Sequence, residues 1–124
     1  MQALLDVMIA ASAPRTRDVR RALTRALARE VPPAYVEDAV LVVNELVTAA
    51  VVNGNGPFHV LVERGPSYVR AAVTDRGGRL PQRLLQPDSP NGAVAFRIVE
   101  TAADSWGIAH LPAETILWAK ILVG

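Results

Sequence analysis

The sequence predicts an α+β fold, a two-layer sandwich in which helices pack on one face of a mixed, largely antiparallel sheet. The hydrophobic period changes several times between that of a strand and that of a helix. The predicted segments follow in the order strand, helix, helix, strand, strand, loop, helix, strand, strand. The chain has 124 residues and no internal repeat or linker, so we expect a single domain over residues 1–124.

The N-terminal half contains one predicted strand and two predicted helices. Residues 2–10 are apolar apart from Gln2 and Asp6, which is typical of a short strand. Residues 15–30 have apolar side chains at helical spacing with arginines between them, which predicts an amphipathic helix. Residues 34–53 are apolar on nearly every side and too many for one strand, so we expect a buried helix that ends at Gly54.

The C-terminal half contains two predicted hairpins. The first joins residues 58–64 to residues 67–75, and the second joins residues 105–110 to residues 115–123. Side chains alternate along a strand, so Asp75 should face the helices at the end of its strand.

Between the hairpins we expect a loop over residues 76–91 and then a helix over residues 93–103. The loop is rich in Gly and Pro and shows no sustained period. Loops of this length in small domains are usually functional.

Composition and charge exclude several classes of function. Thirteen basic residues against twelve acidic ones leave a net charge of +1, which argues against a dedicated nucleic-acid binder. The absence of Cys excludes thiol nucleophiles and thiolate metal sites, and it is compatible with a reducing cytoplasm. No signal peptide or membrane span is indicated, so we expect a cytoplasmic protein that does not bind membranes.

The arginines are unevenly distributed, because six of them fall within fifteen residues of the first predicted helix. They are Arg15, Arg17, Arg20, Arg21, Arg25 and Arg29. This basic face is either a solvated helix surface or a docking site for an acidic partner.

Three positions are candidates for chemistry. Glu45 lies in an apolar helix, where it either meets solvent or caps a loop, or is buried with a raised pKa and acts as a general base. Asp75, followed by Gly77, is either a turn residue or an acceptor that glycine leaves accessible to a ligand. Gly92 opens a helix that either has an ordinary start or holds an anion on its free N–H groups.

Taken together, four segments resemble the histidine-kinase-like ATPase family, and within it the small bacterial anti-sigma-factor serine/threonine kinases. NELVTAAV at residues 44–51 is similar to the family's helix motif ELVTNAV, and VTDRGGRLP at residues 73–81 to its D-x-G box. IVETAADSWGI at residues 98–108 and TILWA at residues 115–119 resemble the family's last two segments. Their order along the chain is also that of the family.

The resemblance implies a Bergerat-type ATP pocket between the helices and the sheet. In it Asp75 would receive the adenine amino group, Gly77 would keep that contact open, and Thr115 would support it. The loop over residues 76–91 would be the ATP lid. Glu45 would activate a serine hydroxyl of a partner, and the usual partners are a sigma factor and an anti-anti-sigma protein.

The sequence departs from the family where magnesium and phosphate are handled. The Asn that holds Mg²⁺ in the family is Ala49 here, which has no oxygen ligand in its side chain. The glycine-rich box before the third helix is reduced to Gly92, and Val94 hinders close approach of phosphate to the backbone. Glu114 replaces the Gly that precedes Thr115.

Adenine recognition is thus largely retained and magnesium binding is not expected. We therefore predict a regulator of the anti-sigma-kinase type that binds a sigma factor or an anti-anti-sigma protein, with weak or lost use of ATP. The alternative is an active ATP-dependent serine kinase that phosphorylates an anti-anti-sigma antagonist. Small kinases of this type often pair through the sheet, so a homodimer is a further expectation of the resemblance.

Overall fold

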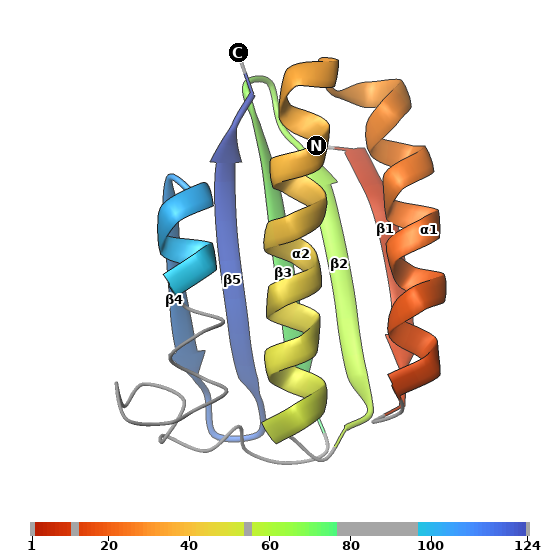
Figure 1. Cartoon of the computed structure of the whole chain (residues 1–124). Coiled ribbons are helices and arrows are strands. Elements are labelled where there is room, and N and C mark those ends of the chain that lie inside the picture. The colour runs from red at the N-terminus through yellow and green to blue at the C-terminus, as the bar shows by residue number, and fades with distance from the viewer. Residues whose placement is uncertain (1, 11–12, 54–55, 77–96, 124) are drawn as a thin grey trace.

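The computed structural model describes residues 2–10, 13–53, 56–76 and 97–123, which build one sheet and the helices that cover it (Figure 1). The strands are β1 (Gln2–Ile9), β2 (Phe58–Arg64), β3 (Tyr68–Asp75), β4 (Ser105–His110) and β5 (Thr115–Leu122). Their order in the sheet is β1-β2-β3-β5-β4, and every described pairing is antiparallel. Both predicted hairpins are confirmed.

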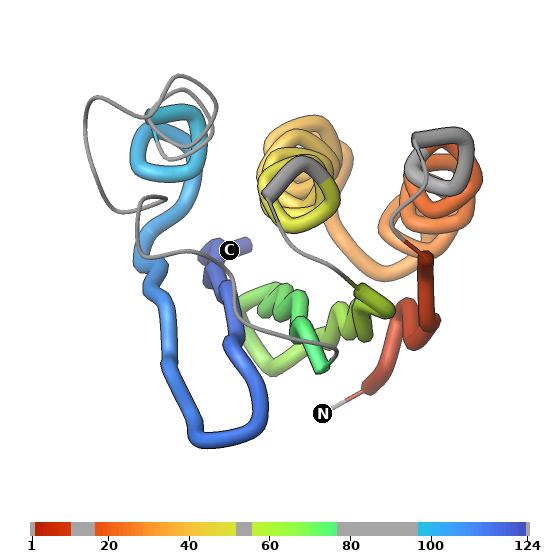
Figure 2. Tube along the Cα trace, turned by 90° about the horizontal axis from the view of Figure 1, so that it is seen from below, coloured from red at the N-terminus to blue at the C-terminus, as the bar shows by residue number. Residues whose placement is uncertain are grey.

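The helices all lie on one side of the sheet, which confirms the predicted two-layer architecture (Figure 2). They are α1 (Ala13–Glu30) and α2 (Pro33–Asn53), together with a helical segment at residues 97–102. Helix α2 contacts β2, β3 and β5 in the middle of the sheet, whereas α1 contacts α2 and β1. The central helix therefore covers the strands that hold Asp75 and Thr115.

Helix α1 is amphipathic, as its sequence predicts. Val19, Leu23 and Leu27 are buried at intervals of four residues, and burial of each stabilises the fold by about 1.5–3 kcal/mol. The last hydrogen bond of this helix is donated by the Val31 N–H to the Leu27 carbonyl. Pro32 follows and cannot continue the pattern because it has no N–H.

The helix side of the sheet is almost completely buried. Val69, Ala71, Val73 and Asp75 alternate along β3, and all four have no exposed surface. The three apolar ones belong to the core that the sheet shares with α2. The alternation that the sequence predicts for β3 is therefore confirmed, with Asp75 on the buried side.

The bounds of the elements differ slightly from those expected. Helix α1 begins two residues before the expected range 15–30, and α2 begins one residue before the expected range 34–53. Such differences are normal where helix ends fray. Most of the expected loop at 76–91 and the start of the expected helix at 93–103 lie outside the described residues.

None of the helices in the described part of the chain combines the length and apolar character that a membrane-spanning helix needs.

Candidate functional site

Neighbouring strands bring Asp75 and Thr115, two of the predicted adenine-binding residues, together at one end of the sheet. Asp75 ends β3 and pairs with Phe58 of β2 on one side and with Thr115 of β5 on the other. Residues paired directly across a sheet point to the same face, so these three side chains form a row on the helix side. The structure thus brings Asp75 and Thr115 side by side, although they are forty positions apart in the sequence.

All three residues of this row are buried. Phe58 and Asp75 have no exposed surface and Thr115 is 2% exposed. A carboxylate is costly to bury unless donors surround it, and Asp75 does have an interaction within the chain. An ionised carboxylate only accepts hydrogen bonds, so this buried site would bind a ligand that donates one. The exocyclic amino group of a purine is such a donor.

The turn before β5 is tied to the residue that follows β3. Arg76 Nε lies 4.0 Å from Glu114 Oε2, and both side chains are partly exposed to solvent. The Arg76 amide also donates to the Pro57 carbonyl. Glu114 therefore lies beside Arg76 at the rim of the row, where an ion pair this exposed contributes little to stability.

Glu45 is partly buried on α2, which runs toward the end of the sheet that carries Asp75 (Figure 1). Burial raises the pKa of the Glu45 carboxyl above its ordinary value, because the charged form loses water. A carboxylate with a raised pKa is a better proton acceptor near neutral pH. The burial of Glu45 is therefore compatible with the predicted base.

Ala49 lies one helical turn after Glu45 on the same face of α2. It is 2% exposed, and its methyl group offers no oxygen to a metal ion. Among the described residues there is no group of three or more His, Asp or Glu side chains that would suit a metal ion. The residues described here therefore do not fit a magnesium site of the family's kind.

Two of the predicted site residues, Gly77 and Gly92, lie outside the described residues, as does Val94. The predicted roles of these glycines beside adenine and phosphate stay predictions.

The structure also shows a feature that the sequence reasoning missed, a groove between α1 and α2. Leu41 lies in it and is 40% exposed, although the sequence predicts α2 to be buried on nearly every side. The signal in the sequence is the pair of polar residues Glu37 and Asn44, which share the Leu41 face at spacings of four and three residues. A helix that is apolar all round would not carry them there.

No family model and no curated protein sequence matches the chain. Its fold nevertheless matches solved structures. A structure of the RsbU and RsbW domains of Rv1364c from Mycobacterium tuberculosis superposes with a TM-score of 0.72 and 22% identity. The match covers 96% of this chain and 32% of that one, so the chain spans about a third of its length.

Two further structures match at 15% identity. The histidine kinase AdeS of Acinetobacter baumannii gives a TM-score of 0.57, with 98% of this chain and 68% of that chain covered. A bacterial phosphotransferase gives a TM-score of 0.58, with 92% of this chain and 64% of that chain covered. The chain has the fold of the histidine-kinase-like ATPases. Identities this low establish the fold alone, and function has to be argued from the site.

Within the histidine-kinase-like fold, the four motif segments occupy neighbouring elements. Residues 44–51 lie in α2 and residues 115–119 in β5. Residues 98–108 run from the third helical segment into β4, and residues 73–81 begin in β3. The described parts of all four segments therefore lie in or beside the layer interface that contains Asp75.

Proposed function

We propose that the chain is a regulatory protein of the anti-sigma-kinase type, which binds a sigma factor or an anti-anti-sigma protein and uses ATP and magnesium weakly or not at all. The observation that carries the proposal is the contrast within one site. Asp75 and Thr115 are buried side by side, as adenine recognition requires, whereas Ala49 offers no metal ligand. Phosphoryl transfer depends on a metal ion that neutralises the developing charge.

In this proposal the buried row holds the base of a nucleotide without driving its hydrolysis. The Asp75 carboxylate accepts from the adenine amino group, and the Thr115 hydroxyl lies beside that carboxylate to orient it. Binding of a partner, rather than turnover, is then the activity of the protein.

An active serine kinase is the second candidate, and Glu45 favours it. A partly buried carboxylate with a raised pKa is suited to take the proton from a serine hydroxyl as its oxygen attacks phosphorus. The same carboxylate can equally be a remnant of that activity, because a base does not replace a metal ion.

Affinity capture tests the proposed function. The tagged chain of residues 1–124 is used as bait in bacterial cells, and the captured proteins are identified by mass spectrometry. We expect a sigma factor or an anti-anti-sigma protein to be enriched over a bait of unrelated fold. Enrichment of neither class, with the bait folded and expressed, would contradict the proposal.

A further inference from the structure

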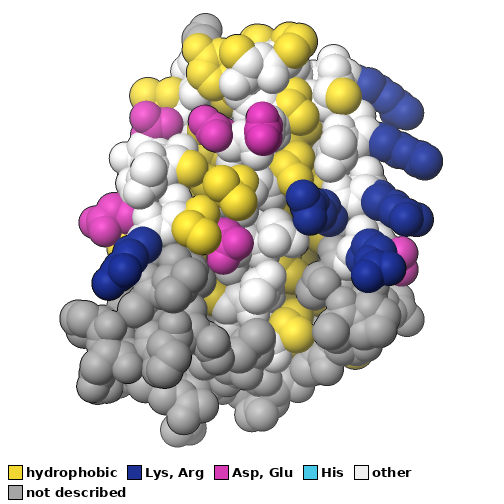
Figure 3. All heavy atoms as spheres, in the orientation of Figure 1, with side chains coloured by type: hydrophobic (Ala, Val, Ile, Leu, Met, Phe, Trp, Pro, Cys, Tyr) yellow, Lys and Arg dark blue, Asp and Glu magenta, His cyan; other side chains and the backbone are white. Residues whose placement is uncertain are grey.

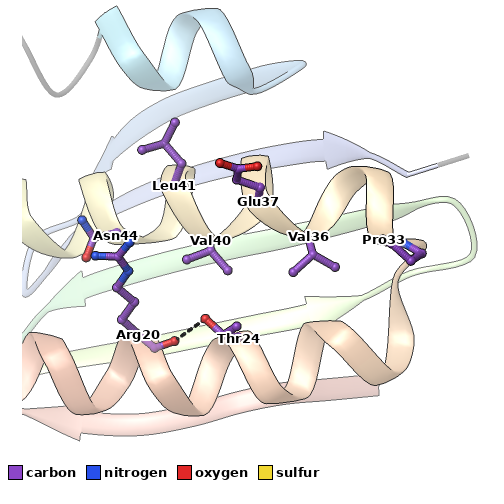
Figure 4. A pocket seen from close by; sticks show the side chains of 8 residues that line it. All are labelled: Arg20, Thr24, Pro33, Val36, Glu37, Val40, Leu41 and Asn44. Atoms are coloured by element: carbon purple, nitrogen blue, oxygen red, sulfur yellow. Dashed lines mark hydrogen bonds between the residues drawn. The ribbon is translucent and has the colours of Figure 1, made fainter.

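Helices α1 and α2 leave a groove of about 480 Å³ on the helix side of the molecule (Figure 4). Eight residues line it: Arg20, Thr24, Pro33, Val36, Glu37, Val40, Leu41 and Asn44. A smaller cavity of about 10 Å³ between the same helices shares Arg20, Val40 and Asn44 with the groove. The groove therefore runs along the outer side of the contact between the two helices.

The groove has an apolar centre. Val36, Val40 and Leu41 contribute aliphatic side chains from α2, and Leu41 is 40% exposed. In Figure 3 hydrophobic side chains lie along the line between the two helices, interrupted by a basic side chain. A single exposed Leu is ordinary, but one that lies in a concave apolar strip offers area that a partner can bury.

The two rims of the groove carry opposite charge. On the α1 side Arg20 belongs both to the groove and to an adjoining pocket of about 500 Å³, which is also lined by Arg17, Arg21 and Arg25. None of these four arginines forms an ion pair with any residue in the described ranges. On the α2 side the rim carries Glu37.

We propose that this groove docks an amphipathic helix of a partner protein. The helix places its apolar stripe on Val36, Val40 and Leu41, its carboxylates against the α1 arginines, and a basic side chain against Glu37. The proposal rests on the proposed partner-binding function and names the surface and the chemistry of the partner. A third helix laid between two others is a common mode of peptide recognition.

The dimensions and charges of the groove favour a helix over the other occupants. From Pro33 to Asn44 the α2 wall is roughly 16 Å long at 1.5 Å per residue, which matches about three turns of a partner helix. A nucleic acid would use the arginines but not the apolar strip, and Glu37 would repel its phosphates. The opposite charges of the rims also fix the direction in which an amphipathic helix can lie.

Designed peptides test the proposal. We would use fluorescein-labelled helical peptides of about 16 residues, with Leu at positions i, i+4 and i+7, Glu along one edge and Lys along the other. Three registers of the charged edges cover the docking alternatives. We expect at least one register to bind the full chain about tenfold more tightly than a peptide of the same pattern in which Lys replaces every Glu. Fluorescence anisotropy measures this difference.

Matched variants locate the binding. Arg20→Glu and Leu41→Glu should each weaken binding about tenfold, because they reverse a rim charge and place a charge in the apolar strip. Arg29→Glu makes the same charge change on the same helix, outside both pockets, and should weaken binding less than about threefold. Circular dichroism confirms that each variant is folded.

The proposal is wrong if no register binds at millimolar peptide, if Arg20→Glu and Arg29→Glu weaken binding equally, or if Leu41→Glu has no effect. It is also wrong if the unliganded chain dimerises and Leu41→Glu dissociates the dimer, because the occupant is then a second copy.

The capture experiment separates the two proposals. If Arg20→Glu and Leu41→Glu still capture a sigma factor or an anti-anti-sigma protein, the proposed function stands and the proposal that the groove docks the partner is wrong. If a designed peptide binds the groove but neither class of partner is captured, the docking surface stands and the proposed function is wrong.

Discussion

The chemistry of the site depends on two residues one helical turn apart on α2. Glu45 retains a carboxylate whose pKa is raised by burial, whereas Ala49 presents a methyl group where a metal ligand would be needed. The Glu45 carboxylate favours proton transfer, whereas Ala49 leaves no metal ion to neutralise the charge that develops on the phosphate. Substitution at each position tests the two halves of the site separately.

Restoring the amide should restore part of the metal site. In Ala49→Asn we expect ATP affinity to become magnesium-dependent, with a gain of about tenfold, because an amide oxygen is a suitable Mg²⁺ ligand. Isothermal titration with ATP, with and without Mg²⁺, measures the gain. Thr48→Asn places the same amide on an exposed position of the neighbouring helix face and should give none. An unchanged titration of a folded Ala49→Asn variant would mean that the pocket differs from the family's in other ways.

Glu45 should also make the stability of the protein depend on pH. Its pKa is higher in the folded chain than the ordinary value of 4.5, so the folded state retains a proton that the unfolded state has released. The protein therefore loses stability as the pH rises from about 4.5 through the raised pKa of Glu45. Glu45→Gln should be more stable than the original chain above this pH range, and this advantage should shrink as the pH falls below 4.5.

Urea unfolding at several pH values measures that difference. Glu37→Gln removes a carboxylate from an exposed position of the same helix and corrects for its general effect. A Glu45→Gln advantage that does not change with pH would show that Glu45 is not desolvated in the folded chain.

At the scale of the elements, the β4-β5 hairpin is held on its outer face by a close contact between Gly107 and Trp118. These residues are paired across the hairpin, and a Cβ on Gly107 would lie 2.8 Å from the indole Nε1. Arg70 lies over the same indole ring, 5.9 Å from its centroid. The position of the ring therefore requires a glycine at position 107.

Gly107→Ala should displace the Trp118 ring. We expect the displaced ring to lose its contact with Arg70, with a loss of stability of about 1–3 kcal/mol from the forced repacking. Urea unfolding gives the stability and near-ultraviolet circular dichroism reports the ring. Ser105→Ala, exposed on the same strand, should change neither. An unaltered spectrum and midpoint in Gly107→Ala would contradict this account of the hairpin.

The elements that could be predicted are those that depend on local periodicity. Alternation along β3 correctly predicts that Asp75 faces the helices, and the apolar spacing in α1 correctly predicts its buried stripe. Periodicity could not predict the contact between Asp75 and Thr115, because the register of β3 against β5 is a non-local property. For the same reason the exposed Leu41 was missed, since the gap between two packed helices is set by their tertiary arrangement.

At the scale of the whole molecule, the fold persists where sequence similarity has become too weak for a family model to match. The buried pattern of five strands and their covering helices is compatible with many sequences, because cores tolerate extensive apolar substitution. The fold does not depend on the polar residues of the site, so these residues can change without altering the architecture. A domain of this fold can therefore carry Ala49 in place of a metal ligand and keep its architecture.

The most direct test of the account is calorimetric titration of the full chain with ATP, once with excess chelator and once with millimolar Mg²⁺. The account predicts weak binding whose affinity differs by less than about twofold between the two conditions, because only the adenine side of the site is retained. Micromolar binding that tightens at least about tenfold with Mg²⁺ would contradict it and favour the active-kinase alternative.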